Sequence, residues 1–264
     1  MDLGLKGKVA VVLAASKGLG RASATALATE GASVTIGSRD QQHLARTAQE
    51  IQQETGSRVL PVPTDVTKAE DTAAIIAATI REFGHLDILV NNAGGPPPGN
   101  FEHFDDAHWQ AAFELNLLSA VRLIRLALPH MRQAGSGRII NIVSTSVKQP
   151  IDGLLLSNAI RPGVIGLAKT LSTELAPENI TVNNVCPGTF YTDRIREGTR
   201  LKHLLAQGMS EEEALRDLAR DIPMRRIGKP EELGALVSFL ASQQASYITG
   251  TTIQVDGGAI RGLY

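Results

Sequence analysis

The sequence has little of several features that define whole classes of protein. It contains a single cysteine, Cys186, which excludes an internal disulfide bond and a zinc site built from several thiolates. Its formal net charge is −1 and it has no long basic run, so no nucleic acid or anionic membrane partner is indicated. No apolar run approaches the ~20 residues that span a bilayer, and residues 1–6 lack the apolar core of a signal peptide. We therefore expect a soluble cytoplasmic protein that binds no metal.

Short apolar runs alternate with longer helical patterns along the chain. Seven runs are candidate strands: Val9–Ala14, Ser33–Gly37, Arg58–Pro63, Leu86–Val90, Arg138–Val143, Thr181–Val185 and Thr252–Val255. Several are apolar nearly throughout, which is typical of parallel strands covered on both faces. Helical patterns over 20–30, 68–83 and 106–132 fill the gaps, and Thr67 with Glu70 predicts a capping box at the second of them. This rhythm predicts an α/β protein of the Rossmann type, a doubly wound parallel sheet of about seven strands flanked by helices.

Nothing in the composition divides the chain into parts. We find no linker-like stretch and no internal repeat, so one domain is expected over residues 1–264. The charged helical segment 193–220 interrupts the strand–helix rhythm and is predicted to be a substrate lid. The stiff segment Gly95-Pro96-Pro97-Pro98-Gly99 is expected to form a wall of the pocket.

A glycine-containing turn follows the first strand. It reads Leu13-Ala14-Ala15-Ser16-Lys17-Gly18-Leu19-Gly20, with the last two glycines opening a helix. Glycines at a helix N-terminus allow the backbone to approach a pyrophosphate, which the unpaired N–H groups attract. Ala14 puts a methyl group where the turn is tightest, so we expect the turn to shift or to avoid positive φ there. The alternative is a plain glycine-rich turn between a strand and a helix.

The end of the second strand bears on the choice between NAD and NADP(H). An NAD site usually offers a carboxylate there to hold the ribose 2′-OH, but no acidic residue precedes Ser38. Arg39 and Lys17 can instead reach a 2′-phosphate, whereas Asp40 is expected to cap the next helix. This pattern favours NADP(H); the alternative is two solvated surface cations.

Further segments complete a family resemblance. Asp65-Val66 and Asn91-Asn92-Ala93-Gly94 follow the third and fourth strands, and Asn183, Pro187-Gly188, Thr192 and Asp256-Gly257-Gly258 follow in order. Over essentially its whole length the chain resembles the short-chain dehydrogenase/reductase family, with its subclass of 3-oxoacyl-carrier-protein reductase-like enzymes the most similar. The glycine turn is similar to that family's Thr-Gly-x-x-x-Gly-x-Gly, with Leu13 and Ala14 in the first two places.

The resemblance implies roles for these residues. Asp65 and Val66 would contact the adenine, and Asn91–Gly94 would line the cofactor. Pro187, Gly188 and Thr192 would frame the nicotinamide carboxamide. The family NADP enzymes carry basic residues at the places of Lys17 and Arg39. Relatives of this kind act on small carbonyl or alcohol substrates and assemble as homodimers or homotetramers, which we carry over as an expectation.

The catalytic residues match the family only in part. Ser144 and Asn116 resemble the family's Ser, which orients the carbonyl, and its Asn, which anchors a water relay. The segment Ser157-Asn158-Ala159-Ile160-Arg161 stands where the family has Tyr-x-x-x-Lys. A serine hydroxyl is a far weaker acid than a phenol, whose pKa is about 10, and it is shorter by a ring. Arg161 can still donate to the ribose, but it stays charged and cannot relay a proton.

Pro162 follows Arg161 directly, where relatives continue a helix. Because proline disfavours helical backbone in the residue before it, we expect a helix that begins near Pro162 or is distorted there. Ser157 and Arg161 would then not share one helical face. Other candidate acids are Tyr191, Lys148 and His103, for each of which a surface or packing role is the alternative; Tyr247 and Tyr264 lie in the C-terminal part.

The leading hypothesis is therefore an NADP(H)-dependent oxidoreductase that interconverts a carbonyl and an alcohol. Ser144 would orient the oxygen, Asn116 would support a water relay and Arg161 would hold the ribose, with the proton coming from water or another residue, helped by Ser157. One alternative is a nucleotide-binding pseudoenzyme or sensor. Another is an enzyme that uses the cofactor transiently in an epimerisation or elimination.

Overall fold

Seven strands form one sheet in the order β3-β2-β1-β4-β5-β6-β7, and every neighbouring pair is parallel. The strands are β1 (Val9–Leu13), β2 (Ser33–Ser38), β3 (Val59–Pro63), β4 (Ile88–Asn91), β5 (Gly137–Ile142), β6 (Ile180–Pro187) and β7 (Thr252–Val255). The structure, a computed structural model, describes residues 2–263. The predicted Rossmann-type fold is confirmed, and each predicted strand is present with small shifts in its bounds.

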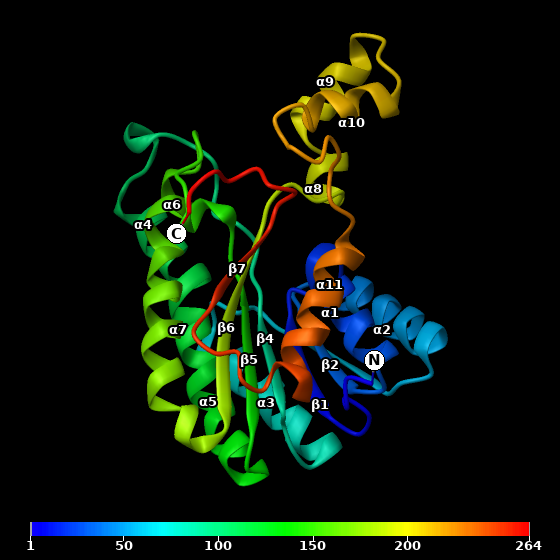
Figure 1. Cartoon of the computed structure of the whole chain (residues 1–264), viewed down its shortest axis with the longest axis vertical. Coiled ribbons are helices and arrows are strands. Elements are labelled where there is room, and N and C mark those ends of the chain that lie inside the picture. The colour runs from blue at the N-terminus through cyan, green and yellow to red at the C-terminus, as the bar shows by residue number, and fades with distance from the viewer. Residues whose placement is uncertain (1, 264) are drawn as a thin grey trace.

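Helices cover both faces of the sheet (Figure 1). One layer contains α1 (Gly18–Thr29), α2 (Gln41–Thr55) and α11 (Pro230–Ala241). The other contains α3 (Ala69–Phe83), α5 (Ser119–Ala134) and α7 (Pro162–Glu174). Each layer has its own cluster of buried apolar side chains against the sheet. The apolar strands are thus buried on both faces, as their sequences predicted.

Two helix starts test the capping predictions. Asp40 caps α2, because its carboxylate accepts a hydrogen bond from the His43 backbone N–H at 3.0 Å. The capping box predicted at Thr67 is wrong. The Thr67 hydroxyl donates to Asp65 Oδ1 at 2.8 Å, and α3 begins at Ala69 with no side-chain cap. The nearby carboxylate of Asp65 is therefore the better partner for that hydroxyl.

The helix predicted over 106–132 is real but not uniform. It consists of α4 (Asp106–Phe113), a π-helical turn over Glu114–Leu118 and α5. Wide turns of this kind interrupt helices mostly at functional sites, because they re-aim one side chain. Here the turn contains Asn116, and it places that side chain near the end of β4.

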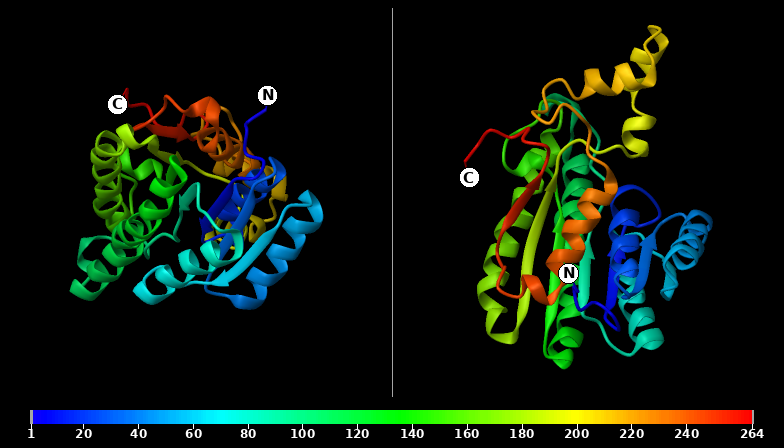
Figure 2. Two further views of the ribbon diagram at one scale, coloured as in Figure 1. Left: turned by 90° about the horizontal axis from the view of Figure 1, so that it is seen from below. Right: turned by 45° about the vertical axis from the view of Figure 1, so that its right-hand side comes forward.

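A helical segment extends from the sheet edge where the strands end. It contains α8 (Asp193–Arg196), α9 (Thr199–Ala206) and α10 (Glu211–Leu218), and the right view of Figure 2 shows it standing apart from the two helical layers. Leu201, Leu204 and Ala214 form a small core of its own. Within residues 2–263, no helix combines the length and the apolar character that crossing a membrane requires.

The strand order reverses between β1 and β4, since β1 pairs with β2 on one side and β4 on the other. In open α/β sheets, ligands bind at such a reversal, outside the carboxyl ends of the strands. The loops that carry the predicted site residues lie at this edge.

Candidate active site

The turn between β1 and α1 combines two backbone features. Ala14 adopts φ +49° and Gly18 adopts φ +59°. The expectation that Ala14 would avoid positive φ is therefore wrong; the alanine takes the left-handed conformation, which costs about 1–2 kcal/mol for a residue with a Cβ. A Cβ on Gly20 would lie 2.3 Å from the Ala14 carbonyl oxygen, so only glycine fits there. The helix N-terminus is thus held tightly beneath the turn, leaving its N–H groups at the sheet edge.

Side chains suited to a phosphate lie beside this turn. Lys17 is exposed, with its Nζ 3.7 Å from an Asp193 carboxylate oxygen, and Arg39 is exposed at the end of β2. Ser38, which directly precedes Arg39, is partly buried, and its hydroxyl has no partner in the described structure. Thr47 holds the turn in place by donating to the Ser16 carbonyl at 2.8 Å. The arrangement offers two exposed cations and a hydroxyl without a partner.

Asp65 lies at the end of β3, where the resemblance places the adenine. Its carboxylate accepts from the Thr67 N–H at 3.0 Å and from the Thr67 hydroxyl at 2.8 Å. Burial works to raise the pKa of Asp65, but these hydrogen bonds and the charges of Arg39 and Lys68 lower it overall. Val66 beside it is buried, so the pair presents a fixed anion next to an apolar side chain.

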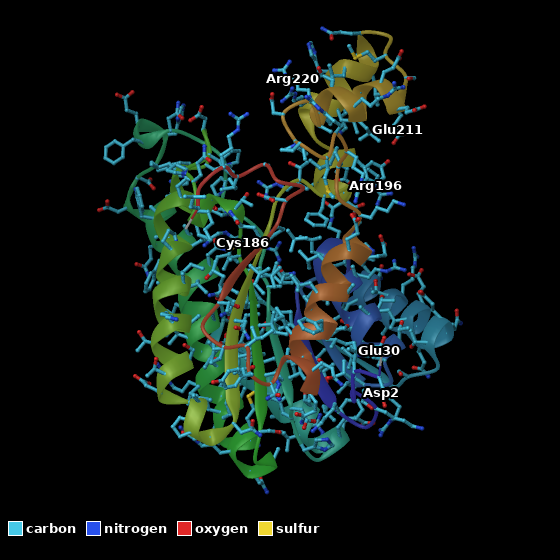
Figure 3. All side chains as sticks on the ribbon, in the orientation of Figure 1. Asp2, Glu30, Cys186, Arg196, Glu211 and Arg220 are labelled. Atoms are coloured by element: carbon cyan, nitrogen blue, oxygen red, sulfur yellow. The ribbon has the colours of Figure 1, made fainter. Side chains whose placement is uncertain are left out.

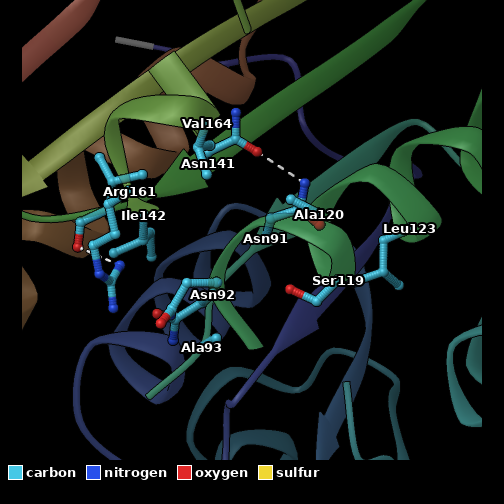
Figure 4. A pocket seen from close by; sticks show the side chains of 12 residues that line it. Asn91, Asn92, Ala93, Ser119, Ala120, Leu123, Asn141, Ile142, Arg161 and Val164 are labelled. Carbon is cyan, nitrogen blue, oxygen red and sulfur yellow. Dashed lines mark hydrogen bonds between the residues drawn. The ribbon is translucent and has the colours of Figure 1, made fainter. Parts of the chain in front are cut away.

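A row of hydrogen-bonded polar side chains crosses the sheet from β4 to β7. Asn91 Nδ2 donates to Asn141 Oδ1 at 2.8 Å (Figure 4). Asn141 Nδ2 donates to Asn184 Oδ1 at 2.9 Å. Asn184 Nδ2 then reaches the hydroxyl of Thr252 at 3.2 Å. The four residues occupy matched positions on β4, β5, β6 and β7. We call this row the amide ladder; of its asparagines, the sequence analysis identified only Asn91. Asn91 and Asn141 lie at the carboxyl ends of β4 and β5, whereas Asn184 lies in the middle of β6.

Asn116 and Arg161 meet the same loop. Asn116 Nδ2 donates to the Gly94 carbonyl at 3.0 Å from the π-helical turn. Arg161 donates to the same carbonyl at 3.4 Å and to the Val143 carbonyl at 2.9 Å. Two of the predicted catalytic residues are therefore brought together just beyond β4 and β5.

Two predictions were made for the segment from Ser157 to Pro162, and the helix boundary near Pro162 is confirmed. Helix α6 (Leu155–Ile160) ends before Arg161, and α7 begins at Pro162. The other prediction is wrong. Arg161 keeps helical dihedrals, φ −63° and ψ −29°, and its N–H bonds to the Ser157 carbonyl. Both side chains are buried and both point towards the segment that follows β5, so they do share a face.

Ser157 does not face the open pocket. Only 6% of the residue is exposed, and its Oγ lies 3.0 Å from Ser146 Oγ. Ser146 in turn donates its backbone N–H to Ser144 Oγ at 3.1 Å. Ser144 is partly exposed at the end of β5 and is the member of the trio that can reach a ligand. Ser157 thus supports the loop that carries Ser144.

Arg161 is a buried cation. It is 7% exposed, and its Nε has no hydrogen-bond partner in the described structure. Burial lowers the pKa of Arg161 to about 10, and the charge of Arg194 contributes in the same direction. The guanidinium is nevertheless charged at neutral pH, so it is a fixed positive group beside Ser144's loop.

A small cavity of about 20 Å³ lies behind these groups. Its polar lining comes from Asn91, Asn92, Asn116, Ser119, Asn141 and Arg161. Figure 4 labels all of these except Asn116. Three atoms of these residues have no partner in the described structure: Asn91 Oδ1, Asn116 Oδ1 and Arg161 Nε. The volume suits one water molecule, and two acceptors with one donor match the hydrogen bonds that a water can form.

Thr192 connects the far side of the site to the glycine turn. A Cβ on Gly18 would lie 3.5 Å from the Thr192 methyl group, so the two segments touch. Pro187 ends β6, and the Gly188 N–H donates to the Val255 carbonyl at 3.0 Å. Thr192 therefore lies against the glycine turn, and Pro187 and Gly188 lie at the end of β6.

The other candidate proton donors differ in their surroundings. Tyr191 donates its hydroxyl to Glu211 in the projecting segment, and Tyr247 is fully exposed; Tyr264 lies outside the described residues. His103 is exposed, and its Nδ1 accepts from the Asn100 N–H.

Lys148 lies near Cys186, a fully buried thiol near the middle of the molecule (Figure 3). Burial raises the pKa of Cys186 to about 12, although Lys148 and Arg161 oppose this rise, so the thiol stays protonated at neutral pH.

The groove fits a dinucleotide. Unpartnered buried polar atoms of Ser38, Asn116 and Arg161 occur from β2 across to β5, and the open N-terminus of α1 lies along the same edge. Unsatisfied groups of this kind are costly unless a ligand or water completes them. Ser38 and Arg161 would hold the two riboses, and the N-terminus of α1 would hold the phosphates between them.

Comparisons with known proteins agree with this geometry. The family model described as "Enoyl-(Acyl carrier protein) reductase" matches residues 13–259. The short chain dehydrogenase/reductase astE of Aspergillus oryzae is 37% identical over 256 residues, covering 96% of this chain and 95% of that protein. This chain belongs to the short-chain dehydrogenase/reductase family. The sequence resemblance to that family is thereby confirmed.

Two further relatives of this short-chain dehydrogenase/reductase are described with a cofactor. The NADPH-dependent reductase BacG of Bacillus subtilis is 33% identical over 257 residues, 97% of this chain and 99% of that protein. The crystal structure of L-sorbose reductase from Gluconobacter frateurii, complexed with NADPH and L-sorbose, superimposes with a TM-score of 0.95 at 36% identity and covers all of both chains. The whole chain, including the projecting segment, is therefore similar to a structure of this family.

Proposed function

We propose that this chain is an NADP(H)-dependent oxidoreductase that interconverts a carbonyl and an alcohol on a small molecule. The observation that carries the proposal is the convergence of Ser144, Asn116 and Arg161 beyond β4 and β5, beside the glycine turn of a dinucleotide site. The NADPH named for BacG and for L-sorbose reductase supports the choice of cofactor.

The cofactor-binding residues divide by element. Lys17, Ser38 and Arg39 would bind the 2′-phosphate end, which disfavours NAD, and Asp65 and Val66 would border the adenine. The turn from Ala14 to Gly20, with Ser16, Gly18 and Leu19, would hold the pyrophosphate at the N-terminus of α1. The remaining contacts would come from Asn91, Asn92, Ala93, Gly94, Pro187, Gly188 and Thr192.

At the reacting end, the nicotinamide when bound supplies a hydride to the carbonyl carbon or accepts one from the alcohol. Ser144 would donate to the carbonyl oxygen, and Arg161 would fix the ribose while its positive charge stabilises the developing alkoxide. The proton that completes the alcohol would come from water, with Asn116 and Arg161 positioning one molecule in the cavity of about 20 Å³. Ser157 would act on Ser144 only through Ser146.

We also propose that residues 1–264 form one domain, that the segment 193–220 is its lid, and that the protein works in the cytoplasm as a homodimer or homotetramer. The α8–α10 segment borders the groove through Thr192 and stands apart from the helical layers, which supports a lid. The single reduced cysteine supports the location.

One observation favours a second candidate, a nucleotide-binding protein without redox turnover. Among residues 2–263, both tyrosine hydroxyls lie away from Ser144: Tyr191 is bonded to Glu211, and Tyr247 is exposed. If no water delivers the proton, the site would bind NADPH and reduce nothing.

The test is NADPH oxidation against a panel of ketones and 3-oxoacyl thioesters, with wild type beside Ser144→Ala and Ser157→Tyr. We expect turnover in the wild type and a loss of about a hundredfold or more in Ser144→Ala. A gain in Ser157→Tyr would measure what the absent phenol costs. NADPH binding with no turnover across the panel would favour the second candidate, and product without net cofactor use would indicate an epimerisation or elimination.

A further inference from the structure

The buried guanidinium of Arg161 has no counter-charge. Its two described hydrogen bonds go to the backbone carbonyls of Val143 and Gly94, and its Nε has no partner. Among residues 2–263, no carboxylate forms an ion pair with it. A buried charge of this kind is costly unless an anion or polar ligand completes its surroundings.

A second guanidinium lies over the same loop. A Cβ on Gly95 would be 2.8 Å from Arg194 Nη1, so Gly95 leaves room for this side chain. Arg161 meets the preceding residue, Gly94, through its carbonyl. Arg194 forms no ion pair within the described residues, whereas Arg196 on the same helix pairs with Asp193. Two arginines from α8 and from the α6–α7 junction thus approach one short loop without an acid between them.

A third cation, Lys148, approaches from the segment after β5 and lies near Cys186, as Arg161 does. Two acids of this region already have partners. Asp256, whose charge also acts on Cys186, accepts from the backbone N–H groups of Gly258 and Ile260, each at 2.9 Å, and Asp193 pairs with Lys17 and Arg196. Arg161 and Arg194 therefore meet at the Gly94–Gly95 loop without an ion-pair partner among residues 2–263, and Lys148 adds a third positive charge near Cys186.

We propose that the substrate carries a carboxylate, and that Arg194, lying over Gly95 beside buried Arg161, binds it while Ser144 orients the carbonyl. Lys148 adds positive potential at the same pocket. The substrate class is thus a small oxo acid, or the corresponding hydroxy acid in the reverse direction. This inference rests on the proposed oxidoreductase function.

The phosphates of the cofactor are the other source of an anion, but their expected places lie elsewhere. The pyrophosphate belongs at Gly18, whose neighbour across the groove is Thr192, and the 2′-phosphate belongs near Lys17 and Arg39. Arg161 and Arg194 meet instead at the Gly94–Gly95 loop, beyond the end of β4. The experiment separates the two sources.

The experiment compares oxo acids with their methyl esters: 2-oxobutanoate, 3-oxobutanoate and 4-oxopentanoate, each beside its ester, with L-sorbose as a neutral ketose. Wild type, Arg194→Gln and the matched control Arg196→Gln are assayed for kcat and KM by NADPH oxidation. The Kd for NADPH is measured separately by fluorescence. Binding of unreactive butanoate to the NADPH complex is measured by calorimetry, which needs no turnover.

We expect at least one acid to exceed its ester in kcat/KM by about tenfold to a hundredfold, the range of one charge-assisted hydrogen bond. Arg194→Gln should remove that preference by raising KM for the acid, while Arg196→Gln keeps it and the Kd for NADPH changes little. Esters or L-sorbose reduced as well as every acid would overturn the inference but leave the oxidoreductase function intact. A loss of NADPH affinity in Arg194→Gln, equal for acids and esters, would also overturn it by assigning Arg194 to the cofactor.

If no substrate is turned over, the calorimetry still tests whether the site binds a carboxylate. Butanoate binding that is present in wild type and Arg196→Gln but lost in Arg194→Gln would support the carboxylate site while the proposed redox function failed. No butanoate binding in the wild type complex, together with no turnover of any acid, would overturn both.

Discussion

Ser146 and Ser157 form a buried hydrogen bond, with their hydroxyl oxygens 3.0 Å apart. The bond joins helix α6 to the turn after β5. In that turn, the Ser146 backbone N–H donates to Ser144 Oγ and holds this side chain in place. Ser157, the residue for which the sequence predicts the family's tyrosine position, is therefore part of the scaffold beneath Ser144.

Ser157→Ala should lower stability more than it lowers activity. The substitution leaves the Ser146 hydroxyl buried and unpaired, which costs about 1–3 kcal/mol. Urea unfolding measures this loss, and the kcat for NADPH oxidation should fall less than tenfold. Ser144→Ala is the opposite case, with stability nearly kept and turnover lost. Equal loss of kcat in the two variants would show that Ser157 takes part in the chemistry.

Ala14→Gly should stabilise the protein and tighten its hold on NADPH. Glycine adopts φ +49° without the cost of about 1–2 kcal/mol that a Cβ incurs, so the free energy of unfolding should rise by roughly 1 kcal/mol. Urea unfolding and NADPH titration check the two effects. Ala15→Gly is the control, because Ala15 has a negative φ and is buried, and it should destabilise instead.

Asn141→Leu should be among the most destabilising conservative changes in the sheet. It leaves Asn91 Nδ2 and Asn184 Oδ1 buried without partners, at about 1–3 kcal/mol for each group. Asn184→Ala lies nearer the end of the amide ladder and should cost less, because Thr252 is only partly buried. Chemical denaturation of both variants tests the order, and an equal cost would contradict it.

Cys186 should make stability fall in alkaline solution. Burial raises the pKa of its thiol to about 12, from an unfolded value of about 8.5. Between these values the unfolded chain loses the proton and the folded chain keeps it, so the contribution is complete below about pH 8.5 and is lost as pH rises towards 12. The slope is at most about 1.4 kcal/mol per pH unit. Unfolding measured from pH 8 to 11 should show a shallower decline in Cys186→Ala.

The parallel sheet of about seven strands could be predicted from the sequence because each strand is a short apolar run and helical patterns fill the gaps between them. The order of the strands was not predicted and is known from the structure. The Ser157–Arg161 geometry could not. Pro162 indicated a helix boundary correctly, but the sequence does not show that Arg161 keeps helical dihedrals, held by its N–H bond to Ser157 and by its guanidinium at Val143. The expectation that Ala14 would avoid positive φ was wrong for a similar reason. The close approach of the Ala14 carbonyl to Gly20 outweighs the preference of about 1–2 kcal/mol that alanine has against the left-handed conformation.

The π-helical turn at Asn116 depends on a contact distant in sequence, because Asn116 reaches Gly94. The start of α3 depends on a local competition, in which the Thr67 hydroxyl bonds to Asp65, two residues away, and not to the helix. The candidate site residues were recognisable singly, but the buried cation of Arg161 and its nearness to Arg194 appear only when α6, α7 and α8 are packed around the end of β4.

The amide ladder has a consequence for folding specificity. Strands β4 and β5 are buried along their whole length, so apolar patterning alone would tolerate a shifted alignment between them. An asparagine displaced by one position would face apolar neighbours with its amide unsatisfied, and the misaligned sheet would lose several hydrogen bonds at once. The hydrogen bonds of Asn91, Asn141 and Asn184 therefore favour one register of the four parallel strands over registers shifted by one residue.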